Sequence, residues 1–132
     1  MIKIGVDEGY AYDMLAIQTV KQEKAPSPKS GAAITQLACD IIAATTTEGH
    51  IGVICSKEHQ DLIDTNRKLF ELIDELNKHP ADCSCYGCQV NRLNYVRFLC
   101  KRALQAKFFP ENAPTEQKLG YRQAESGAPT TP

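Results

Sequence analysis

The segment 89–109 limits the possible folds of this chain more than any other, because it is long, acid-free and apolar on nearly every side. It reads QVNRLNYVRFLCKRALQAKFF, and Pro110 follows it. A helix that is apolar all round is usually enclosed by its neighbours. We therefore expect it to be the most buried helix, with some of its cations inside the protein. These cations are Arg92, Arg97, Lys101, Arg102 and Lys107.

The rest of the pattern predicts a mainly α fold: four helices and a small two-stranded β ribbon. In the helical segments, apolar residues recur every three or four positions. The string MIKIGV alternates apolar and other residues, and HIGVIC resembles it, so both favour short strands that pair with each other. Ser56 is a suitable N-cap for the third helix, and Pro80 ends it. The expected helices are 10–21, 32–44, 57–79 and 89–109.

The chain has 132 residues, which is enough for one domain with its own core. We expect a helical domain over 1–109 and a disordered, flexible tail over 110–132, where large apolar residues are few. The net charge of −1 argues against binding of long nucleic acid. No stretch approaches the ~20 apolar residues of a membrane span, and the N-terminus has no apolar signal-peptide core. These features predict a cytoplasmic protein with reduced thiols.

Polar residues interrupt two of the apolar helix faces. His59, Asn66 and Asn77 fall within the apolar stripe of 57–79, and Asp13 lies among the apolar residues of the first helix. A buried amide needs a partner, and it can fix how helices pair within the chain or across a homodimer. Alternatively, Asn66 faces a ligand. A buried carboxylate needs a counter-charge, which 89–109 supplies in excess.

The cations of 89–109 allow two interpretations. In the first, they form ion pairs with Asp13 and with the acids of the third helix. In the second, they form a small cationic pocket, in which arginine and lysine hold phosphate or carboxylate and a tyrosine stacks on a base. The candidate ligand-binding residues are Tyr10, Tyr12, Asp13, Asn66, Arg92, Arg97 and Lys101.

The string HPADCSCYGC, residues 79–88, contains four possible ligands for tetrahedral zinc. These candidate metal ligands are His79, Cys83, Cys85 and Cys88. They form a single cluster rather than two separated pairs, so unliganded thiols, a structural zinc ion and disulfide or redox chemistry all stay open. The sequence requires no other cofactor.

Three common catalytic motifs are missing from the sequence. There is no glycine-rich phosphate loop, no Gly-x-Ser-x-Gly and no His-Glu-x-x-His. We therefore expect a protein that is not an enzyme. A metal-dependent enzyme that holds a cation with Asp7, Glu8 and Asp13 is the alternative in that class.

Three strings, DEGYAYDMLAIQTVK, SKEHQDLIDTNRKLFELID and LNYVRFLCKRALQAKFF, resemble small, mostly helical proteins of tailed bacteriophages. The resemblance covers about half of the chain and includes neither the cysteine string nor the tail. It implies a viral accessory or counter-defence protein in the host cytoplasm. By analogy, such a protein is a homo-oligomeric sponge that sequesters a small anionic ligand, such as a cyclic nucleotide immune signal. The alternative is a zinc-stapled or plain helical protein–protein interaction module.

Overall fold

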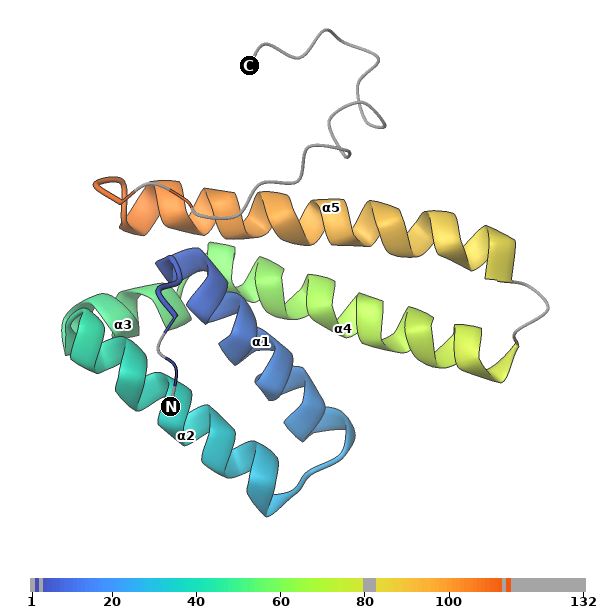
Figure 1. The fold of residues 1–132 in the computed structure, drawn as a ribbon, viewed down its shortest axis with the longest axis horizontal. Coiled ribbons are helices and arrows are strands. Elements are labelled where there is room, and N and C mark those ends of the chain that lie inside the picture. The colour runs from blue at the N-terminus through green and yellow to red at the C-terminus, as the bar shows by residue number, and fades with distance from the viewer. Residues whose placement is uncertain (1, 3, 80–82, 113, 115–132) are drawn as a thin grey trace, which may run out of the picture.

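The computed structural model describes residues 2, 4–79, 83–112 and 114, with the backbone alone for 83–85. Within these residues the fold is mainly helical, as predicted, but it has five α-helices rather than four (Figure 1). In chain order they are α1 (Glu8–Lys24), α2 (Pro28–Ala44), α3 (Thr47–Ile54), α4 (Lys57–Lys78) and α5 (Cys83–Phe108). No helix in the described part of the chain is long and apolar enough to cross a membrane.

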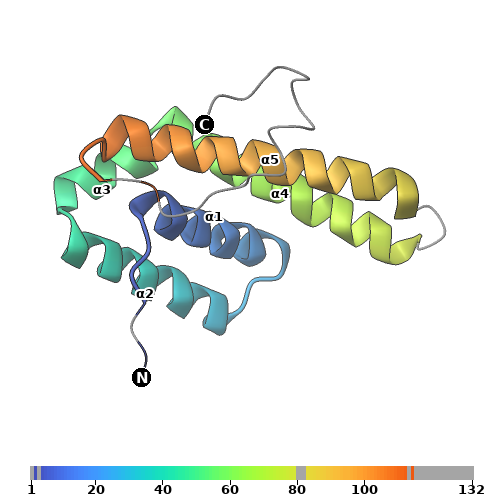
Figure 2. The same cartoon turned by 45° about the horizontal axis from the view of Figure 1, so that its top comes forward.

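The helices α4 and α5 run side by side and form the most extensive helix pair. Helix α1 packs on both of them near one end of the pair, α2 lies along α1, and the short α3 joins α2 to α4 (Figures 1 and 2). The other end of the α4–α5 pair projects beyond the remaining helices in both views. The packed interior therefore lies where α1 meets the α4–α5 pair.

Local capping explains where several helices begin. The Asp7 side chain accepts a hydrogen bond from the Tyr10 amide, and Ser27 and Thr46 cap α2 and α3 in the same way. The Ser56 side chain accepts from the His59 amide and caps α4, as the sequence predicted. Each oxygen satisfies an amide that has no partner inside the helix.

The predicted β ribbon is wrong for the described residues, in which no strand is present. The second expected strand is instead helix α3, which begins at a Thr46 cap that accepts from the Gly49 amide at 3.0 Å. The first expected strand, MIKIGV, has no strand beside its described residues, and Ile2 and Ile4 are 88% and 79% exposed. A lone two-stranded ribbon is marginal, so the locally capped helix forms instead.

The most buried helix is α1 rather than α5, so this expectation was also wrong. The buried residues of α1 are Gly9, Tyr12, Asp13, Leu15, Ala16 and Val20. Among the described residues, α5 is covered on one side by α4, α1 and α3, and Val96 and Leu99 are 38% and 42% exposed on it. Its apolar surface therefore exceeds what the other helices cover.

Gly9 lies within α1, where it permits a close approach to α5. A Cβ atom at this position would lie 2.8 Å from the backbone oxygen of Lys101. The Gly9 amide also donates to Gln105 Oε1 at 2.8 Å. The role of Gly9 is steric, because any side chain at this position would push the two helices apart. The predicted tail, by contrast, lies largely outside the described residues.

Candidate functional site

A buried ion cluster joins α1, α4 and α5, and Asp13 is its centre. Asp13 Oδ1 accepts from the Asn66 side-chain amide at 2.9 Å. Asp13 Oδ2 lies 3.8 Å from Lys101 Nζ and 3.7 Å from Arg97 Nε. The side chains of Asp13 and Lys101 are about 5% and 6% exposed, so this carboxylate and ammonium are withdrawn from water. The first interpretation of the cations, ion pairing with Asp13, is confirmed for Arg97 and Lys101.

Tyr10 and a second amide bond complete the surroundings of this ion cluster. The ammonium of Lys101 also lies over the Tyr10 ring, 5.6 Å from its centroid. Asn66 donates a further hydrogen bond to its own helix, at Leu62 O. The Arg97 Nε is buried and has no hydrogen-bond partner among the described residues. Five of the seven candidate ligand-binding residues thus meet at one place.

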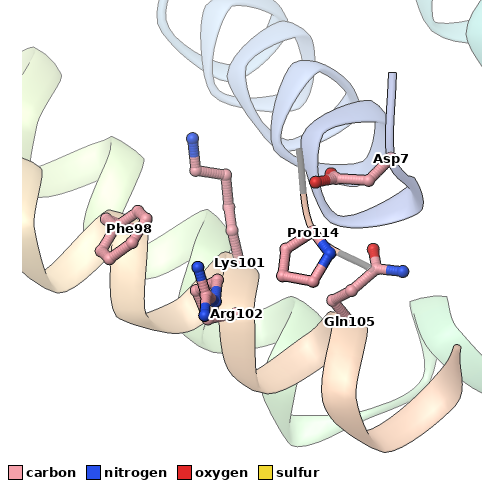
Figure 3. Close-up of a pocket in the computed structure, with 6 residues that line it drawn as sticks. All are labelled: Asp7, Phe98, Lys101, Arg102, Gln105 and Pro114. Atoms are coloured by element: carbon pink, nitrogen blue, oxygen red, sulfur yellow. The ribbon is translucent and has the colours of Figure 1, made fainter. Parts of the chain in front are cut away.

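Space for a ligand beside this cluster is small. A cavity of about 10 Å³ lies between α5 and the segment that precedes α1, and Figure 3 shows the side chains that line it. In that view the ammonium of Lys101 points away from Asp7 and Pro114. The same ammonium lies within 3.8 Å of Asp13 Oδ2. A cavity of this size holds about one water molecule. A nucleotide does not fit unless the helices separate.

Tyr12 and Arg92 lie apart from the ion cluster. Arg92 is exposed on α5, toward the projecting end of the helix pair. Tyr12 is fully buried on another side of α1, where it contacts His50, His59 and Phe109. Its hydroxyl is hydrogen-bonded to His50 Nδ1 at 2.9 Å. We call Tyr12, His50 and His59 the tyrosine–histidine cluster.

Burial sets the protonation of this second cluster. It raises the pKa of the Tyr12 hydroxyl to about 12, with a smaller contribution from the charge of Glu8. It lowers the pKa of His59 to about 4, with a smaller contribution from His50, whose own pKa is also lowered by burial. All three groups are neutral near pH 7. His59 Nδ1 is buried and has no hydrogen-bond partner among the described residues.

A cleft of about 330 Å³ lies between α1 and α2 and is bordered by the N-terminal segment. Its apolar lining includes Ile4, Ala11, Met14, Leu37, Ile41 and Ala44. Its acidic lining consists of Asp7, Glu8 and Asp40, and none of the described residues that line it is basic. Volumes of this size are typical of binding pockets. Sequence periodicity did not reveal the cleft, because it depends on how far apart α1 and α2 lie.

Two of these carboxylates are held by neighbouring amides. Gln105 and Asn112 donate to the two oxygens of Glu8, at 2.8 and 2.6 Å. Gln36 donates to Asp40 Oδ1 at 2.8 Å. Side-chain amides orient a carboxylate without neutralising it, so Glu8 and Asp40 keep the cleft negative.

The candidate zinc ligands are only partly covered by the described residues. The predicted loop is helical from Cys83 onward, so Cys88 lies inside α5 rather than at its start, and its side chain is exposed. His79 is exposed and lies 3.8 Å from a Glu75 oxygen. The side chains of Cys83 and Cys85 lie outside the described residues. Elsewhere, the described part of the chain has no group of three or more potential metal ligands.

Comparison with known proteins identified no relative of this chain. No protein-family model, no curated protein and no solved structure matches this chain.

Proposed function

We propose that this chain is a non-enzymatic interaction module that binds a basic, apolar peptide segment of a partner protein. The binding place is the cleft between α1 and α2. The observation that supports this proposal is the combination of an apolar lining with the carboxylates of Glu8 and Asp40 and no basic residue among the described residues that line the cleft. Complementary charge then favours a segment that carries lysine or arginine beside its apolar side chains.

The shape of the cleft favours a peptide over a compact ligand. One wall follows α2 from Leu37 through Ile41 to Ala44, which are one helical stripe about 11 Å long. The other wall follows the first two turns of α1 and includes Met14, which is 39% exposed. An apolar groove between two helix stripes suits an amphipathic segment of about two turns.

A pair of synthetic peptides tests this proposal. The first is an amphipathic helix of leucine and lysine, and in the second every lysine is replaced by glutamate. Fluorescence anisotropy of labelled peptides should show binding of the lysine form at least about tenfold tighter than the glutamate form, as charge complementarity requires. Equal binding of both peptides, or binding of neither, overturns the proposal.

Matched variants locate the binding place. Ala44→Trp fills the cleft and should weaken the lysine peptide by more than about tenfold. Ala103→Trp, at an alanine on α5 that is also exposed, should leave binding unchanged. Asp40→Lys should also weaken binding, whereas Asp74→Lys reverses an exposed helical carboxylate outside the cleft and serves as its control. A loss in both members of a pair contradicts binding at the cleft.

The second candidate function is capture of a small anion by Arg97 and Lys101. It is favoured by the convergence of these cations with Asn66 and Tyr10, the arrangement that a cationic pocket needs. It requires the anion to compete with Asp13 and the adjoining cavity to widen. Thermal-shift measurements with cyclic and linear nucleotides test it. Stabilisation by one of them, reduced in Lys101→Met, favours this function over peptide binding.

A further inference from the structure

The projecting end of the α4–α5 pair continues an interior seam into solvent. On α4, the residues Asn66, Phe70, Ile73 and Asn77 follow one another at intervals of four, three and four, so they share one face. Asn66 is buried against Asp13 of α1, whereas Phe70 and Ile73 are 39% and 43% exposed. The same face is therefore covered at one end and open at the other.

Helix α5 repeats this arrangement in the opposite chain direction. Lys101, Arg97, Asn94 and Val90 share a face by the same spacing. Lys101 and Arg97 contact Asp13, while Asn94 and Val90 are half-buried farther along the helix. Because α4 and α5 are antiparallel neighbours, the two faces run from the Asp13 ion cluster toward the same end of the pair (Figure 1).

Helix α1 does not cover this end. Its last residue, Lys24, pairs with Glu71 at 3.5 Å, and Glu23 pairs with Arg67 at 2.8 Å. The end of α1 thus lies level with Glu71, on the edge of α4, and Ile73 and Asn77 are beyond it. Both views show α1 diverging from α5 toward its C-terminus (Figures 1 and 2). We call Phe70, Ile73, Asn77, Val90 and Asn94 the arm face.

We propose that the arm face is the interface of a homodimer, in which the projecting ends of α4 and α5 from two copies form a four-helix bundle. Two helices with an open apolar face make half of such a bundle, and a two-fold axis supplies the other half. In the antiparallel arrangement α4 lies over α5 of the second copy. That contact is complementary in net charge, because residues 69–78 of α4 carry Glu71, Asp74 and Glu75 against Lys78 alone, whereas residues 83–97 of α5 carry Arg92 and Arg97 and no acid.

The polar members of the arm face suit a self-pairing seam. Asn77 is exposed and Asn94 is half-buried. Asn77 lies about one helical turn from Ile73, and Asn94 lies about one turn from Val90. An asparagine on an otherwise apolar seam fixes register at some cost in affinity. The interface is also short, so the dimer is expected to be weak, with a dissociation constant on the order of 10 μM.

Sedimentation of the full chain in reducing buffer tests the dimer, and the chain offers matched controls. Ile73 and Leu99 are 43% and 42% exposed, and Phe70 and Val96 are 39% and 38% exposed. Leu99 and Val96 lie on the outer side of α5, away from the arm face. Ile73→Asp and Phe70→Asp should weaken the dimer by more than about thirtyfold, and Leu99→Asp and Val96→Asp by less than about twofold.

A strengthening variant keeps the test valid if an aspartate variant fails to fold. Asn77→Leu removes a polar residue from the seam and should tighten the dimer by at least about fivefold. A wild-type chain that remains monomeric at about 200 μM overturns the proposal. Equal effects at Ile73 and Leu99 also overturn it, because they place the contact on the other side of α5. A dimer that Asn77→Leu leaves unchanged counts against the seam in the same way.

Discussion

Tyr12 and Asp13 are adjacent on α1, and each is the centre of a buried polar cluster, but the two clusters differ in charge. Asp13 lies close to two cations and one amide. Tyr12 is surrounded by rings that are neutral at pH 7, one of which has a nitrogen without a partner among the described residues. The comparison shows that the first cluster depends on counter-charge and the second on pH.

The largest effect is expected from removing the charge of Asp13. In Asp13→Asn the buried Lys101 ammonium and the Arg97 guanidinium lose their shared counter-ion. Leaving a buried charge uncompensated costs about 3–5 kcal/mol of folding free energy. Chemical denaturation followed by circular dichroism measures this loss.

The matched change at Lys101 should be milder. Lys101→Met leaves Asp13 with Arg97 and Asn66, so we expect a loss of about 1–2 kcal/mol. The double variant Asp13→Leu with Lys101→Met removes both charges and should be more stable than Asp13→Asn alone. If Asp13→Asn lowers the folding free energy no more than Lys101→Met does, Asp13 is not the counter-ion on which both cations depend.

Mild acid should act on the tyrosine–histidine cluster. The pKa of His59 is about 4 in the folded protein and 6.5 as its ordinary value. Because the folded pKa is the lower one, the stability is fully present above pH 6.5 and is lost as pH falls toward 4. His59 alone accounts for a loss of about 2 kcal/mol between pH 7 and pH 5. The lowered pKa of His50 adds to this loss in the same direction.

Denaturation curves at several pH values check this window. His59→Phe keeps an aromatic ring beside Tyr12 and removes the titrating group, so it should flatten the decline between pH 7 and pH 5. His79→Phe, at an exposed histidine, serves as the control and should leave the decline unchanged. A decline that persists in His59→Phe assigns the acid sensitivity to other groups. The lowered pKa values of Glu23 and Glu58 place the contribution of these carboxylates at more acidic pH.

The same comparison shows what the sequence could predict. The ion cluster was predictable, because a carboxylate on an apolar helix face needs a cation and one acid-free helix supplied several. Asn66 was identified by the same reasoning. The partners of Tyr12 were not predicted, because His50 was assigned to a strand. The apolar residues of 50–55 are compatible with either structure, and only the Thr46 cap favours the helix.

The orientation of α1 was the second feature that the sequence did not predict. Its apolar residues point in several directions, so their spacing does not define which side is buried. The three-to-four spacing of Tyr10, Met14, Ile17 and Val20 favours these residues for the buried side. Val20 is buried, yet Tyr10 and Met14 are both 39% exposed. The residues that pack inside are Tyr12, Leu15, Ala16 and Val20. The deciding contact is the approach of Gly9 to α5, which depends on the tertiary arrangement rather than on periodicity.

The smallest effect is expected from Tyr12→Phe, which removes only the hydroxyl that is hydrogen-bonded to His50 at 2.9 Å. The ring contacts with His59 and Phe109 remain, and the loss leaves one buried imidazole nitrogen without its partner. Such a change costs about 1–2 kcal/mol. Tyr12→Phe combined with His50→Phe should be non-additive, because either change alone already breaks the bond. Strictly additive losses in denaturation would show that the hydroxyl and the imidazole do not stabilise each other. The stability of the tyrosine–histidine cluster would then depend on ring packing alone.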